Sequence, residues 1–339
     1  MTVATEASTL TRFCSLCARQ ASLDPAGHAH AYEHVLAVEI PLPWPETMYD
    51  TPGVLPQELL DFRALVIESY ERGEPIRSTW LAIAPDRAYS LSGFRRVISY
   101  RRPQGHFAEF TQQEYLVPEE LYGPLCWAQL VAPEDLPRFD EYLLLSATTR
   151  DLMVCTHGSV DAACAKFGFP IYRYLRQLAD QSQGQLRVWR VSHFGGHVFA
   201  PTLLDLPEFR YWAYIEREQA DLLFDRQCDA VQLYDHYRGW AGFDSAFLQT
   251  AERELFVKFG WSWISYLKTG EVLAEGPEDD NGLPWADVRI DYISPDGTER
   301  GAYEAHVTLS HHVETIHSSK SEDTYPYPQY AVTRLEQCA

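Results

Sequence analysis

The order of predicted elements most constrains the fold, because it occurs twice in the first 240 residues. In the first half, a β-rich segment is followed by a helix whose apolar residues recur near a 3.6-residue spacing. Three strand-like segments come next. In chain order the five expected elements span residues 34–40, 56–72, 79–84, 95–101 and 107–117.

The second half repeats this order and adds a final helix. Its expected elements span residues 151–155, 162–181, 186–192, 202–206, 210–215 and 216–237. The order strand, helix, strand, strand, strand, helix is typical of the thioredoxin-like fold. We therefore expect an α/β (α+β) protein with two thioredoxin-like units in tandem, which repeat in element order and not in sequence.

The C-terminal residues follow a different pattern. Asp244 and Ser245 can cap a helix that runs to about Lys258. The turn-rich, acidic segment 270–284 predicts an exposed loop. Two segments of alternating polarity flank the turn Ser-Pro-Asp-Gly and predict a β-hairpin, whereas residues 318–339 are expected to be loosely ordered. The expected domains are residues 1–145, a degenerate thioredoxin-like unit without metal ligands; 146–240, the unit that carries them; and 241–339, a helix and β-hairpin extension.

The charge balance excludes some partners. The chain has 48 acidic and 28 basic residues, a formal net charge of −20, which disfavours nucleic acid and anionic membrane surfaces. It suits a partner with a basic docking surface. No segment approaches the roughly 20 apolar residues of a membrane span, and the first 19 residues lack the apolar core of a signal peptide. We therefore expect a cytoplasmic protein whose seven cysteines are mostly reduced.

Two pairs of metal-binding residue types stand at strand ends in the second unit. Cys155 ends a predicted strand, and Cys164 follows after eight residues, near a helix start. His193 and His197 follow the next strand and enclose Phe-Gly-Gly. Because both pairs fall at corresponding ends of neighbouring strands, we expect the four side chains to converge. Two thiolates and two imidazoles suit zinc, a [2Fe–2S] cluster or copper.

The segments around these pairs resemble the sucrase/ferredoxin-like family of thioredoxin-like ferredoxins. The resemblance rests on VCTHGSVDAACAKFGFP, VWRVSHFGGHVFAPT and LPEFRYWAYI, and more weakly on FCSLCARQA, VEIPLPWP and YRGWAGFD, which resemble bacterial-type members. In that family the Cys-x8-Cys and His-x-Gly-Gly-His motifs bind a [2Fe–2S] cluster. The resemblance therefore implies Cys155, Cys164, His193 and His197 as cluster ligands, and an electron carrier rather than an enzyme with its own substrate.

Two other functions use the same residues. A structural zinc ion can take all four ligands. A thioredoxin-like thiol–disulfide oxidoreductase can use Cys155 and Cys164 as its redox pair. A cluster with two imidazole ligands is less negative than one with four thiolates, so its reduction potential should be higher; the Rieske range is roughly −150 to +300 mV, against about −400 mV for plant-type centres.

Several neighbours are candidates to orient or tune the ligands. Hydroxyl and carboxylate groups can hydrogen-bond the imidazoles, although turn and cap roles are their more ordinary interpretation. A lysine can add positive charge, two glycines let the backbone turn, and a proline in Ala-Pro-Thr is similar to the cis-proline of thioredoxins. These candidates are Thr156, Asp161, Lys166, Ser192, Gly195, Gly196 and Pro201.

Other cysteines and histidines receive simpler interpretations. Cys14 and Cys17 have the spacing of a redox dithiol. They precede every predicted strand, which favours a partly buried helix instead. His157 is expected on a surface loop, and His317 in a polar tail. The cysteines at positions 126, 228 and 338 are isolated in the sequence.

Overall fold

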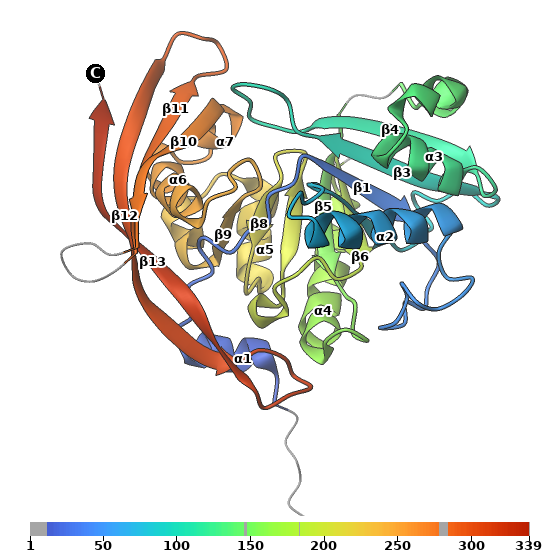
Figure 1. Cartoon of the computed structure of the whole chain (residues 1–339), viewed down its shortest axis with the longest axis horizontal. Helices are drawn as coiled ribbons and strands as arrows, with labels where there is room; N and C mark the ends of the chain where they lie inside the picture. The colour runs from blue at the N-terminus through green and yellow to red at the C-terminus, as the bar shows by residue number, and fades with distance from the viewer. Residues whose placement is uncertain (1–11, 146–147, 183, 278–283, 339) are drawn as a thin grey trace, which may run out of the picture.

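Nine strands form the larger of two sheets (Figure 1). The computed structural model describes residues 12–145, 148–182, 184–277 and 284–338. The strands are β1 (His34–Glu39), β2 (Ser78–Ile83), β3 (Phe94–Arg101), β4 (Thr111–Pro118), β5 (Arg150–Cys155), β6 (Leu186–Val191), β7 (Leu203–Leu206), β8 (Arg210–Trp212) and β9 (Tyr237–Trp240). They lie in the order β4-β3-β1-β2-β6-β5-β7-β8-β9.

The remaining elements are helices and a second, antiparallel sheet of four strands. The helices are α1 (Cys14–Gln20), α2 (Gln57–Glu71), α3 (Tyr122–Leu130), α4 (Ala162–Ala179), α5 (Arg217–Asp225), α6 (Ala246–Phe259) and α7 (Ser262–Ser265), with 3-10 turns at Pro133–Tyr142, His197–Phe199 and Ala230–His236. The second sheet contains β10 (Leu267–Gly276), β11 (Trp285–Ile293), β12 (Arg300–Ile316) and β13 (Thr324–Cys338). None of the described helices has the length and apolar composition needed to cross a membrane.

The two halves of the larger sheet have the same pairing. β1 pairs in parallel with β2 and antiparallel with β3, which pairs antiparallel with β4. β5 pairs in the same way with β6 and β7, and β7 with β8. The halves meet where β2 and β6 pair antiparallel through Ile83 and Val191. The predicted α+β class is confirmed, and the pairing matches the repeated element order.

Residues from all parts of the described chain contribute to the hydrophobic core. Alternate residues of β1 enter different clusters, as the two faces of a strand require: Leu36 and Val38 pack in one with Phe62 of α2, and Val35 belongs to a larger one. That larger cluster continues through β5–β8 and α6 to Val288 of β11. All three expected domains therefore contribute to one apolar cluster, and their boundaries stay a prediction.

The expected helix over residues 216–237 is wrong in its C-terminal half. α5 ends at Asp225, and Arg226 adopts a left-handed backbone with φ of 49°. The Arg226 guanidinium lies 2.8 Å from a carboxylate oxygen of Asp205 and 2.6 Å from one of Glu208. The helix thus ends where Arg226 forms ion pairs with residues outside it. The spacing of apolar residues in the sequence does not predict these ion pairs.

The C-terminal segment is more ordered than its sequence predicts, although the expected hairpin is confirmed as β11 and β12. Where a loop is predicted over 270–284, β10 continues to Gly276; residues 278–283 lie outside the described ranges. Where a loosely ordered tail is predicted over 318–339, β13 pairs along β12. Pro326 and Pro328 disfavour a strand, but β13 is an edge strand, where a missing N–H is tolerated.

A buried ion pair anchors α6 to the larger sheet. Arg210 on β8 donates from Nη1 to Oε1 of Glu252 on α6 at 2.8 Å, and both side chains are fully buried. The Tyr237 hydroxyl and the Trp263 indole also donate to this carboxylate, at 2.6 and 2.8 Å. The ion pair therefore connects the expected domain 146–240 with the expected extension 241–339.

Replacing Glu252 with alanine should strongly destabilise the fold, because the Arg210 charge would stay buried without its partner. We expect the free energy of unfolding in urea to fall by about 3–5 kcal/mol. Glu68→Ala removes an exposed helical ion pair with Arg72 and should change stability little. Similar losses in the two variants would contradict this role of Glu252.

Acid should destabilise the protein partly through His34. Burial, followed by the charge of Arg101, lowers the pKa of His34 from 6.5 to about 3. Between these values the unfolded chain binds a proton that the folded chain does not, so stability falls as pH falls. The loss is at most about 1.4 kcal/mol per pH unit. Urea unfolding at a series of pH values should show a shallower dependence in His34→Gln; parallel curves would contradict the assignment.

Candidate metal centre

Three of the four predicted ligands converge at one end of the larger sheet. The ligand atoms of Cys155, Cys164 and His193 all lie within 4.8 Å of one another. Nδ1 of His193 is 3.9 Å from each of the two sulfur atoms. Cys155 is the last residue of β5, Cys164 lies in the first turn of α4, and His193 follows β6 by two residues. Because β5 and β6 are parallel, their ends bring these segments to the same edge.

His197 lies beside this group and faces a second one. Its ring centroid is 5.4 Å from that of His193. Its Nδ1 is 3.4 Å from the sulfur of Cys14 and 3.7 Å from a carboxylate oxygen of Asp161. Cys14, Asp161 and His197 therefore form a neighbouring cluster of possible ligand atoms. The structure brings the fourth predicted ligand next to the other three, but not into contact with their sulfurs.

Two glycines let the histidine loop turn tightly. Gly195 and Gly196 have φ of 90° and 76°, in the left-handed region that other residues rarely adopt. A Cβ at Gly195 would lie 2.4 Å from Nε2 of His30, and one at Gly196 would lie 2.6 Å from the guanidinium of Arg238. The sharp turn expected of this Gly-Gly pair is present.

Asp161 is the most connected of the candidate orienting residues. It caps α4 by accepting from the Ala163 N–H at 2.8 Å. It also accepts from the Ser319 N–H at 2.8 Å, the Ser319 hydroxyl at 2.7 Å and the Ser318 hydroxyl at 3.0 Å. Burial favours the neutral acid, but the hydrogen bonds from Ser319 and Ala163 outweigh it and lower the pKa of Asp161. A carboxylate therefore stands beside His197.

The other candidates have different contacts. The Thr156 hydroxyl accepts from Arg190, and the Ser192 hydroxyl accepts from the Ala82 N–H, so both bond elsewhere. Lys166 and Pro201 line a groove of about 480 Å³ beside α1. The Ala200–Pro201 peptide bond, whose isomer the sequence leaves open, is cis.

The expectation that His157 lies on the surface is wrong. Its side chain is buried, and its Nδ1 accepts from the backbone N–H of His193 at 3.2 Å. Its Nε2 lies 3.2 Å from the carbonyl oxygen of Trp44, to which it donates. His157 thus holds the backbone of one predicted ligand in place. Nothing in the sequence indicates this, because the carbonyl comes from the first unit.

Two further residues near the site were not predicted to approach it. Cys14 is buried in α1, as the helix interpretation of the Cys-x-x-Cys pair predicts, but its sulfur faces His197. His317, assigned to a polar tail, has its ring centroid 5.1 Å from that of His197. Both come from distant parts of the chain, so residue spacing carries no signal for them.

The protonation states of Cys155 and His197 suit metal binding, whereas the hydrogen bond to Cys155 raises the pKa of the Cys164 thiol well above its usual value, so Cys164 must lose its proton when a metal binds. A hydrogen bond from Cys164, assisted by His193, lowers the pKa of the Cys155 thiol well below its usual value, despite burial. Burial, followed by the nearby His193, lowers the pKa of His197 to about 4, so its imidazole is neutral at pH 7. A thiolate and a neutral imidazole are the forms that bind metals.

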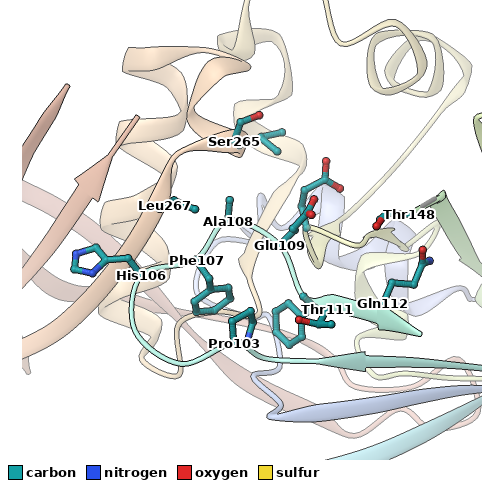
Figure 2. Close-up of a pocket in the computed structure, with 13 residues that line it drawn as sticks. Pro103, His106, Phe107, Ala108, Glu109, Thr111, Gln112, Thr148, Ser265 and Leu267 are labelled. Atoms are coloured by element: carbon teal, nitrogen blue, oxygen red, sulfur yellow. The ribbon is translucent and has the colours of Figure 1, made fainter. Parts of the chain in front are cut away.

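One cavity of the described residues lies away from these side chains. It has a volume of about 540 Å³ and lies between the segment 103–112 and the start of β10. Figure 2 shows Phe107, Glu109 and Gln112 around it, and none of the four predicted ligands lines it. The converging thiols and imidazoles therefore remain the candidate site.

Gly168→Ala should disrupt the metal centre through packing alone. A Cβ there would lie 2.1 Å from the carbonyl oxygen of Cys155, so α4 would have to move away from β5. We expect about 1–3 kcal/mol of lost stability and less bound metal, measured by urea unfolding and elemental analysis. Gln177→Ala, on the exposed side of the same helix, is the control. Unchanged metal content in Gly168→Ala would contradict this account.

Comparison with protein-family models matches residues 25–239 to the sucrase/ferredoxin-like family. No curated protein and no solved structure matches the chain. The matched region contains Cys155, Cys164, His193 and His197, and it ends before α6. Because the match covers more than half of the chain, the protein belongs to the sucrase/ferredoxin-like family.

Proposed function

We propose that this protein transfers single electrons by means of one [2Fe–2S] cluster held by Cys155, Cys164, His193 and His197. The observation that carries the proposal is the convergence of the first three ligand atoms within 4.8 Å, with the His197 ring alongside. All four residues lie in the region matched to a ferredoxin-like family. When bound, such a cluster supplies one-electron oxidation and reduction.

The donor set fits this cofactor. Two thiols and two imidazoles are the ligand types of Rieske-like centres. Cys155 and Cys164 are buried, while His193 and His197 are partly exposed. The thiols therefore face the protein interior, and the imidazoles lie nearer to solvent. Electron exchange should occur on the histidine side, where a redox partner can approach.

The surrounding residues orient the donors and exclude water. His157 holds the backbone of His193, and the Gly195–Gly196 turn places His197 beside it. Phe194, within the histidine loop, and Phe199, two residues after it, are buried and add apolar surface beside the donors. The partner remains unidentified; the net charge of −20 supports one with a basic docking surface.

The two alternatives fit the site less well. A thiol–disulfide oxidoreductase needs a sulfur that a substrate can reach, whereas Cys155 and Cys164 have 1% and 0% of their surface exposed. Structural zinc is compatible with the same donors. The zinc and cluster proposals differ in colour and in metal content, which allows a direct test.

Protein purified without oxygen should be red-brown and contain about two irons and two acid-labile sulfides per chain, as one [2Fe–2S] cluster requires. His193→Ala and His197→Ala should lose the cluster or shift its visible absorption and electron paramagnetic resonance spectra. His311→Ala, an exposed histidine on β12, is the matched control and should leave the spectra unchanged.

Two results would overturn the proposal. A colourless protein with one zinc ion per chain would assign the four residues a structural role. Identical spectra and iron content in wild type, His193→Ala and His197→Ala would remove the histidines from the ligand set.

A further inference from the structure

We infer that Cys14 and Asp161 orient His197 so that the two histidines of the proposed ligand set bind through different ring nitrogens: His193 through Nδ1 and His197 through Nε2. Cys14 and Asp161 are thus positioning residues, not ligands. The inference rests on the proposed metal centre and adds a specific geometry to it. It involves parts of the chain outside the family match, which begins at residue 25 and ends at residue 239.

The ring of His193 points Nδ1 toward the thiols. This nitrogen is 3.9 Å from the sulfur of Cys155 and 3.9 Å from that of Cys164. The backbone N–H of the same residue donates to His157, which limits how far the loop can shift. A metal held by both sulfurs would therefore meet Nδ1 of His193 first.

The ring of His197 has the opposite arrangement. Its Nδ1 is 3.4 Å from the sulfur of Cys14, within the range of a hydrogen bond to sulfur. The Cys14 thiol in turn lies 3.6 Å from Oδ1 of Asp161, to which it can donate. The thiol can thus accept from Nδ1–H and donate to the carboxylate. Since the two nitrogens of an imidazole point in different directions, Nε2 is the one left for a metal.

Asp161 is held rigidly enough to act in this way. Its oxygens accept from the Ala163 N–H and from Ser318 and Ser319, which leaves little freedom for the side chain to rotate. With the Cys14 thiol as a further, longer contact to Oδ1, donors surround both oxygens, which argues against Asp161 as a metal ligand. It is the anchor for the Cys14 thiol.

These contacts join helix α1 to the loop between β12 and β13. The Cys14 N–H donates to the Ser319 hydroxyl at 3.0 Å, and that hydroxyl donates to Asp161 at 2.7 Å. Lys320 lies 2.6 Å from a carboxylate oxygen of Glu46, which ties the same loop to the first unit. Helix α1 and the loop of the β12–β13 hairpin therefore meet at the Nδ1 side of His197. Figure 1 shows the helix beside this end of the hairpin.

The contacts of Cys14 and Asp161 at the Nδ1 side of His197 should increase the affinity of the site for its metal. A hydrogen bond to the second nitrogen of a histidine ligand fixes its tautomer and orientation, and loss of the partner typically lowers metal affinity 10- to 100-fold. Cys17 offers a matched control, because it lies on the same helix and contacts Arg12 at 3.3 Å instead of His197.

The test uses histidine labelled with 15N at Nδ1 alone or at Nε2 alone. Pulsed electron paramagnetic resonance of the reduced full-length protein should show one iron-bound nitrogen from each label. His197→Ala should remove the Nε2-labelled signal, and His193→Ala the Nδ1-labelled one. Two iron-bound nitrogens from the same label would overturn the inference while leaving the cluster proposal intact. Absence of any iron-bound nitrogen would overturn the histidine ligands themselves.

Variants test the orienting residues directly. Cys14→Ala and Asp161→Asn should release iron to a chelator about 10- to 100-fold faster than wild type. Cys17→Ser should match wild type, and Cys14→Ser, which keeps a group that can bridge, should recover part of the loss. Circular dichroism and thermal unfolding identify variants that fail to fold. Folded Cys14→Ala and Asp161→Asn proteins with wild-type release rates and label pattern would overturn the role of both residues.

Discussion

The parallel pairing of β5 and β6 is the constraint on which the candidate site depends. It brings the end of β5, which carries Cys155, next to the end of β6, which leads to His193. Helix α4 must then cross back over the sheet, and Gly168 lets it lie close to β5, so Cys164 reaches the same point. Backbone pairing and one close helix–strand contact therefore bring three of the predicted ligands together.

The first unit carries no predicted ligand but still contributes to the site. Trp44 follows β1, and its carbonyl oxygen accepts from His157, which holds the backbone of His193. The β2–β6 junction makes the two halves a single sheet. The unit with the predicted ligands is therefore supported by the unit without them, and the core also extends across the expected boundary between the two.

Much of the fold could be predicted from the sequence, because both units consist of short elements with clear apolar periodicity. The four ligand candidates stood out through their spacing at strand ends, and the fold places them side by side. Contacts between distant segments could not be predicted. The approach of Cys14 to His197 and of Ser319 to Asp161 depends on how helix α1 and the β12–β13 loop pack against the second unit. Strand β13 could not be predicted either, because its prolines disfavour a strand unless it lies at the edge of a sheet.

The meeting of α1 with the β12–β13 hairpin has a consequence for biosynthesis. Ser318 and Ser319 hold Asp161, yet a ribosome makes them long after it has made every predicted ligand. Until then Asp161 lacks three of its four N–H and O–H donors, so the carboxylate beside His197 is held in place only after residues 318 and 319 have been made and the C-terminal hairpin has docked.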